Sequence, residues 1–226
     1  MIDNIPYPAV PPTPAGTRWL ALGAVAGPAL FTLAWFVFGF LSPGYTIFGT
    51  EISPYSPISQ PISGLGLGPS APFMNAAFVL SGILLMAGVI GVFQTPTIRA
   101  SSRSAARWAC VALLALSPLG LVVAGIFTLE DPLPHPIGFL LTTGIPVLSF
   151  LAAGVFLRGI PRWRRFGTWL LLGSPLTLVL VVLSFLTFDQ ATIVAGQGVA
   201  GLTQRILALE VLAWFAAMGW LAFRRP

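Results

Sequence analysis

Six long apolar segments, separated by short polar connections, constrain this chain more than any other feature. Only 8% of the residues are charged and the mean hydropathy is +0.91, whereas a soluble domain carries about 25% charged residues. About 20 apolar residues suffice to cross the hydrocarbon core of a bilayer. The sequence therefore predicts an all-α polytopic membrane protein, with a transmembrane domain at residues 18–226 and crossings at about Trp19–Leu41, Phe73–Phe93, Trp108–Leu129, Ile137–Leu157, Phe166–Phe188 and Leu202–Phe223.

The arginines predict how these crossings are oriented. All eleven basic residues are arginine, and ten of them fall on one side of the membrane when both chain ends are placed on that side. Because basic residues concentrate in cytoplasmic connections, we expect both termini to be cytoplasmic, with residues 1–17 as a proline-rich cytoplasmic tail. The exception is Arg205, which lies near the outer end of the sixth crossing. The absence of lysine, together with many Ala, Gly, Pro and Leu residues, favours the inner membrane of a bacterium.

The longest connection joins the first two crossings and is predicted to lie on the outer side. It runs from about Ser42 to Pro72, is rich in proline, serine and glycine, and has Glu51 as its single charged residue. Five of its prolines exclude a long helix, yet it is too apolar for a freely solvated loop. We expect it to fold back onto the helices.

Polar residues gather at the outer ends of the predicted crossings. The stretch Glu130–Pro136 holds the single histidine, His135, together with Asp131. Glu210 lies deeper, roughly 12 Å along the sixth crossing from Leu202, and ionisable residues inside a membrane are candidates for functional sites. The predicted ligand-binding residues are Ser63, Asn75, Asp131, His135, Arg205 and Glu210, and the candidate catalytic residues are Asp131 and His135.

Several kinds of chemistry can be drawn from these residues. Ser63, His135 and Asp131 supply the residue types of a catalytic triad. However, Pro-Leu-Pro between the acid and the histidine predicts an extended path of roughly 12 Å, which is too long for Asp131 to orient the ring. The alternative is that His135 caps the fourth crossing. One histidine and scattered acids lack metal-ligand spacing, so neither a metal nor a cofactor is expected.

Arg205 leaves two hypotheses open. With His135, Asn75 and the helix start near Gly201, it could bind a phosphate or carboxylate head group. It could instead form a structural ion pair with an acid from another segment, and then Asp131 is preferred over Asp189. A guanidinium near hydrocarbon needs such a partner, because an unpaired charge there is costly.

Several short motifs recur in an order that resembles a known family. They are SQPISGLG at residues 59–66, Phe73-Met74-Asn75, the run from Gly125 to Asp131, His135 with Gly138, and GLTQR at residues 201–205. In this order they resemble the uncharacterised domain-of-unknown-function family 998 (DUF998), over about Leu20 to Phe223. The resemblance implies six crossings and a polar outer cluster, and it implies no activity.

The function expected from these residues is a polar pocket that opens outward and binds a lipid head group or a small amphiphile. One alternative is an enzyme that acts on such a lipid with Asp131 or His135 as acid or base. A second is a small proton-linked transporter that uses Glu210. Membrane lipid and a small amphiphilic or anionic ligand are the expected partners, and nucleic acid is not.

Overall fold

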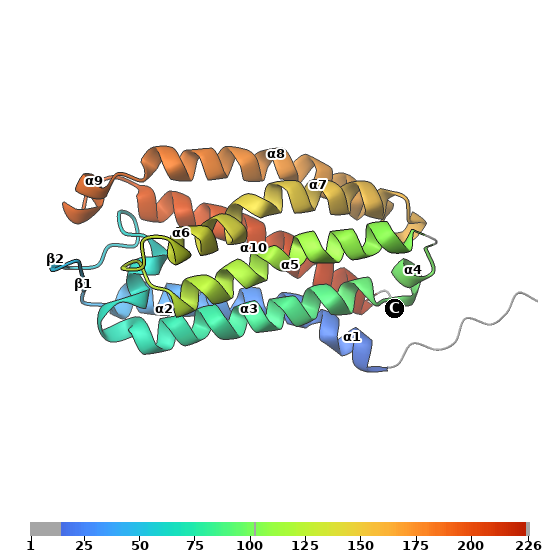
Figure 1. Cartoon of the computed structure of the whole chain (residues 1–226), viewed down its shortest axis with the longest axis horizontal. Coiled ribbons are helices and arrows are strands. Elements are labelled where there is room, and N and C mark those ends of the chain that lie inside the picture. The colour runs from blue at the N-terminus through green and yellow to red at the C-terminus, as the bar shows by residue number, and fades with distance from the viewer. Residues whose placement is uncertain (1–14, 102, 225–226) are drawn as a thin grey trace, which may run out of the picture.

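The computed structural model describes residues 15–101 and 103–224 of the chain, and its long helices lie side by side in one elongated bundle (Figure 1). Within these residues, six helical stretches are long and apolar enough to cross a membrane. They are Arg18–Leu41, Gly68–Phe93, Ser104–Ile126, Pro134–Arg158, Pro161–Thr187 and Ala200–Arg224. The predicted all-α class with six crossings is therefore found. The predicted tail at residues 1–17 lies outside the described residues except for its last three, which begin the first helix.

The crossings are built from the following helices. The first combines α1 (Ala15–Ala21) and α2 (Gly23–Leu41), and the second and third are α3 (Ala71–Phe93) and α5 (Ser104–Ile126). The fourth combines α6 (Pro134–Phe139), the π-helical turn η3 (Leu140–Gly144) and α7 (Ile145–Arg158). The last two are α8 (Arg164–Thr187) and α10 (Ala200–Arg224), and the short helices between crossings are α4 (Pro96–Arg99), η4 (Pro161–Trp163) and α9 (Gln190–Val194).

Two differences from the predicted boundaries lie around the third connection. Helix α5 ends at Ile126 instead of Leu129, because Phe127 takes an extended conformation and the Asp131 side chain accepts a hydrogen bond from the Thr128 amide. The fourth crossing begins at Pro134, three residues before the predicted start. Proline is tolerated in a first turn, where the missing N–H would have had no partner.

The π-helical turn η3 has a local cause. Pro146 has no N–H, so the carbonyl of Thr142 loses its usual partner four residues on. The Ser117 hydroxyl of α5 donates to that carbonyl at 2.9 Å, and the Thr142 hydroxyl donates to the Gly138 carbonyl at 2.8 Å. A neighbouring helix thus satisfies the freed group, which is how membrane helices accommodate proline.

Glycines allow α2 to approach α3 closely. A Cβ atom on Gly27 would lie 2.6 Å from the Ser81 carbonyl, and one on Gly23 would collide with the Leu84 carbonyl. This contact follows from the spacing of the two glycines on one face of α2. Larger side chains fill the remaining core, where Phe31 stacks edge-on against Phe78 with ring centroids 4.7 Å apart.

The two ends of the bundle differ in charge. At one end, here called the hairpin end, lie α6, α9 and a two-stranded antiparallel hairpin of β1 (Tyr45–Ile47) and β2 (Thr50–Ile52) (Figure 1). The other end, here called the arginine end, carries α4, η4 and the end of α10. Four acids, Glu51, Glu130, Asp131 and Asp189, belong to the hairpin end, whereas nine of the ten described arginines belong to the first turns, last turns or connections of the arginine end.

The connection between α2 and α3 is packed against the helices, as predicted. It contains the hairpin and two 3₁₀ turns, η1 (Ile62–Gly66) and η2 (Gly68–Ser70). Every residue from Ser59 to Leu67 is buried. This placement brings the SQPISGLG motif into the interior of the hairpin end.

Candidate functional site

Arg205 holds the connection between α2 and α3 against α10, and its hydrogen-bond partners include no carboxylate. Its Nη1 donates to the carbonyls of Pro57 at 2.7 Å, Gln60 at 3.0 Å and Gly201 at 3.0 Å, and its Nη2 donates to the Tyr55 hydroxyl at 2.5 Å. The guanidinium also lies 5.4 Å from the centre of the Trp35 ring. Arg205 is only 5% exposed.

These contacts overturn the predicted ion pair between Arg205 and Asp131. Backbone carbonyls carry partial negative charge and can satisfy a guanidinium without an acid. Asp131 is occupied elsewhere, since its Oδ2 accepts from the Thr128 amide at 2.7 Å. Asp189 likewise caps α9 by accepting from the Thr192 amide at 3.0 Å. Among the described residues, neither acid is a hydrogen-bond partner of Arg205.

Further contacts hold the same segment in place. The Ile62 amide donates to the Gln204 Oε1 at 2.6 Å, and the Leu202 amide donates to the Ile58 carbonyl at 2.9 Å. A Cβ atom on Gly201 would collide with the Gln60 carbonyl, so only glycine permits this approach. The motifs SQPISGLG and GLTQR are far apart in the sequence, but they pack against each other in the fold.

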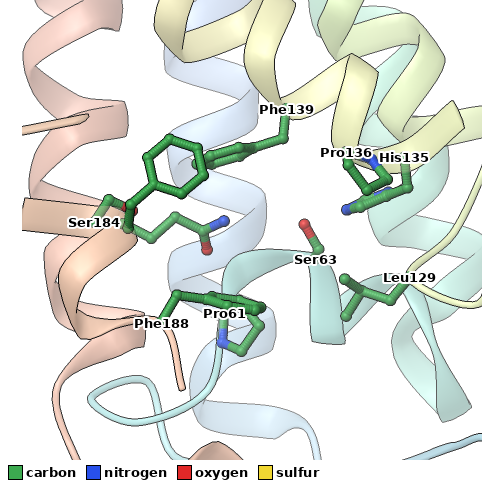
Figure 2. Close-up of a pocket in the computed structure, with 10 residues that line it drawn as sticks. Pro61, Ser63, Leu129, His135, Pro136, Phe139, Ser184 and Phe188 are labelled. Carbon is green, nitrogen blue, oxygen red and sulfur yellow. The ribbon is translucent and has the colours of Figure 1, made fainter. Parts of the chain in front are cut away.

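A cavity of about 160 Å³ opens beside this contact (Figure 2). Its walls come from four parts of the chain: the connection before α3, the α5–α6 connection with α6, the end of α8, and α10. Most of the lining is apolar, and the residues that line it are Pro61, Ser63, Leu129, His135, Pro136, Phe139, Ser184, Phe185, Phe188 and Gln204. Phe139 of α6 meets Phe185 of α8 edge-on, with ring centroids 5.9 Å apart.

A smaller cavity of about 40 Å³ continues toward the core of the bundle. It shares four lining residues with the first, namely Ser63, His135, Phe139 and Gln204. Thr142 and Thr143 of the π-helical turn line its far side. The irregular turn created by Pro146 therefore adjoins this interior space, in the way that π-turns often accompany functional sites.

His135 is buried, and its ring is oriented by the backbone. Its Nδ1 lies 2.8 Å from the Phe127 carbonyl. A carbonyl can only accept, so Nδ1 carries the hydrogen, and in the neutral ring Nε2 has the free lone pair. Figure 2 shows the His135 ring on α6 and the Ser63 hydroxyl on η1 directed into the same cavity.

Two predictions about His135 are wrong. The residue does not cap the fourth crossing; it lies within the first turn of α6, whose N-terminal flanking residue is Leu133. The Asp131–His135 stretch is not extended, because the His135 amide donates to the Asp131 carbonyl at 3.4 Å, as in a helical turn. Proline in a first turn is compatible with such a turn as well as with an extended path, and here the turn prevails.

The remaining candidate residues lie outside both cavity linings. Asn75, in the first turn of α3, donates to the Gly66 carbonyl at 3.2 Å and so fixes the end of η1. Glu210 lies between α10 and α8, where the Thr177 hydroxyl and the Trp214 indole contact its carboxyl group. Of the six predicted ligand-binding residues, the structure brings only Ser63 and His135 together in one cavity. No three His, Cys, Asp or Glu side chains among the described residues could jointly hold a metal ion.

Two tyrosines of the connection are buried around the contact with Arg205. Burial raises the pKa of the Tyr45 hydroxyl, and ionised Tyr55 would raise it further. Burial also raises the pKa of Tyr55, although the Arg205 guanidinium partly opposes that rise. The Tyr45 ring fills the space that a side chain on Gly64 would need. Both tyrosines are therefore neutral parts of the support beneath η1.

Sequence reasoning missed the apolar walls of the cavity. Phe139, Phe185 and Phe188 stand among many other phenylalanines in apolar segments, so no local pattern singles them out.

The fold and the hydropathy of its helices define a multi-pass membrane protein, with six helices among the described residues long and apolar enough to span a membrane. The chain belongs to the family described as Protein of unknown function (DUF998), whose sequence profile matches residues 25–221. No curated protein and no solved structure matches the chain.

Proposed function

We propose that this membrane protein binds a small amphiphile or a lipid head group in the cavity at its hairpin end. The observation that carries the proposal is the composition of the lining, which combines phenylalanine walls with four polar side chains, Ser63, His135, Ser184 and Gln204. Ligand pockets in proteins have this character, with apolar walls and a few placed polar groups that set orientation. A cavity of about 150 Å³ lined by apolar side chains accommodates a benzene-sized group.

The polar groups favour an uncharged, hydrogen-bonding head. The nearest buried cation, Arg205, donates to carbonyls and a tyrosine and does not line the cavity. Gln204 accepts from the Ile62 amide through Oε1, which leaves its Nε2 hydrogens for a ligand. A hydroxyl, ester or amide head can pair with these donors and with His135, whereas a phosphate would have no cation in the lining to offset its charge.

We also propose that the hairpin end faces outward from the inner membrane of a bacterium and that the arginine end is cytoplasmic. The charge asymmetry between the two ends supports this orientation. Reporter fusions after Arg103 and Arg165 should be cytoplasmic, and fusions after Pro134 and Gly196 should be external. An external Arg158–Arg165 connection would reverse the orientation.

Binding can be tested with a long-chain alcohol that carries a photoreactive group. Ser184 is buried in the cavity wall, so Ser184→Phe should fill the cavity and abolish cross-linking to α6 and α8. Leu186→Phe is the matched control, since Leu186 lies two residues further on and is 75% exposed. If Ser184→Phe cross-links as strongly as the control while melting normally, the cavity is not the binding site.

A specific observation favours a second candidate, acyl transfer or hydrolysis of a lipid ester. Ser63 and His135 point into one cavity, and the Phe127 carbonyl orients the ring so that Nε2 can act as a base. Here a backbone carbonyl takes the place that an acid holds in a triad. A fluorophosphonate probe should then label Ser63, and both Ser63→Ala and His135→Ala should abolish labelling. The transporter alternative has no comparable support, because Glu210 lines neither cavity.

A further inference from the structure

Glu210 lies near the middle of the membrane-spanning part of α10. It is ten residues after Ala200 and fourteen before Arg224, about 15 Å and about 21 Å along the helix axis. The hydrocarbon core of a bilayer is about 30 Å thick. The carboxyl group therefore lies at a depth where water is absent, and an acid at that depth needs a specific environment.

The hydrogen bonds around the carboxyl group accommodate a proton, because every contacting group has a partner when Glu210 is in the acid form. The Thr177 hydroxyl oxygen lies 3.0 Å from each carboxyl oxygen and 3.2 Å from the Gly173 carbonyl, and the Trp214 indole N–H donates to Oε1 at 2.5 Å. A hydroxyl has one hydrogen, so it cannot serve an ionised carboxylate and the Gly173 carbonyl together. In the acid form Oε2–H donates to Thr177, and Thr177 donates to Gly173.

Within residues 15–101 and 103–224, no cation lies close enough to stabilise an ionised Glu210. Helices α2, α3 and α8, the turn η3 and helix α1 all pack against α10. Of these, α2, α3 and η3 contain no titratable side chain. Arg205 is bound to the connection, and Arg164 and Arg165 begin α8, at least twelve residues and so about 18 Å from Thr177. Arg18 donates to the Phe223 carbonyl at the arginine end.

The carboxyl group can be reached from the lipid side. Glu210 is half-buried, and exposed apolar side chains flank it on both helices, Leu176 on α8 and Leu209 on α10. The fifth crossing, Pro161–Thr187, which contains α8, has the lowest buried share of the six crossings among the described residues. An apolar reagent dissolved in the bilayer can therefore contact the seam between α8 and α10.

We propose that Glu210, Thr177 and Trp214 form a proton-binding site within the membrane, and that Glu210 is a modification site for apolar carbodiimides. The acid adds across one C=N bond of the carbodiimide: its proton goes to nitrogen and its oxygen bonds to the central carbon. The acyl group then shifts from oxygen to nitrogen, which gives a stable acylurea. Nothing leaves, so the protein gains the mass of one reagent molecule. The protonated Glu210 links α10 to α8 through its hydrogen bond with Thr177, and this site is independent of the proposed ligand cavity.

The test is to treat the full chain, in detergent or in vesicles near neutral pH, with dicyclohexylcarbodiimide and to map the adduct by peptide mass spectrometry. One adduct is expected, on Glu210. Glu210→Gln should lose the adduct completely. Glu51→Gln is the matched control, because Glu51 is exposed in β2, and it should keep the adduct. A water-soluble carbodiimide should show the opposite preference and modify the exposed acids.

An independent readout is infrared spectroscopy, in which the carbonyl band of a protonated carboxylic acid should be present in the parent and absent from Glu210→Gln. The proposal is overturned if the folded parent shows no adduct on Glu210, or if the apolar reagent modifies the exposed acids as fast as Glu210. It is also overturned if the infrared band persists in Glu210→Gln. Peptide mapping of the parent decides the matter even if Glu210→Gln does not fold.

Discussion

Replacing Arg205 with alanine should destabilise the hairpin end more than any other single change of a polar residue. The substitution removes the donors that bind the carbonyls of Pro57 and Gln60 and the hydroxyl of Tyr55. The Pro57 carbonyl would lose this donor, and the Gln60 carbonyl would keep only the longer contact, 3.5 Å, with the Tyr55 hydroxyl. Hydrogen bonds to charged groups contribute about 1.5–3 kcal/mol each, and breaking a buried charged network costs about 3–5 kcal/mol in total. We expect a loss of this size.

The assay combines thermal melting of the purified protein in detergent with limited proteolysis. Arg205→Ala should lower the melting temperature and open the region between residues 54 and 69 to cleavage. Arg158→Ala is the matched control, because Arg158 is an exposed arginine at the other end of the bundle, and it should behave like the parent. Arg205→Lys should recover only part of the loss, since an ammonium cannot reproduce the geometry of a guanidinium.

A double-mutant cycle separates this account from the ion-pair hypothesis. Arg205 and Tyr55 share a hydrogen bond, so Arg205→Ala and Tyr55→Phe together should cost less than the two single losses added. Asp131→Asn should not rescue Arg205→Ala, because Asp131 binds the Thr128 amide instead. Additive losses with Tyr55→Phe, or rescue by Asp131→Asn, would refute the contacts described for Arg205.

Three further predictions follow from particular contacts. Gly201→Ala should destabilise the protein by about 1–3 kcal/mol in melting experiments, because the new Cβ would collide with a backbone carbonyl; Gly144→Ala, whose nearest neighbour would be 3.8 Å away, should be tolerated. When absorbance is followed in alkali, Tyr45 and Tyr55 should ionise only above their usual pKa of about 10. Tyrosines in the unfolded chain lose their protons at a lower pH than these two, so the free energy of unfolding should be constant below a pH of about 10 and fall as the pH rises above it. Ser117→Ala should cost about 1–3 kcal/mol, because it leaves the carbonyl freed at the π-helical turn without its donor.

The number of crossings and the charge difference between the two ends were legible in the sequence. Both depend on sums over neighbouring residues: twenty apolar side chains in a row, or arginines repeated in alternate connections. The packing of the long connection was also predictable, since it carries one charge and many apolar residues.

The partners of the polar residues were decided by the tertiary structure alone. Arg205 meets Tyr55 across 150 positions of the chain and Pro57 across 148, so no local pattern could indicate that carbonyls, and not Asp131, would satisfy it. The orientation of the His135 ring likewise depends on where α5 ends, because the ring contacts the Phe127 carbonyl, which lies directly after that helix. Hydropathy is additive along the chain and survives any packing, whereas a hydrogen bond needs two groups within about 3 Å, which only the folded bundle provides.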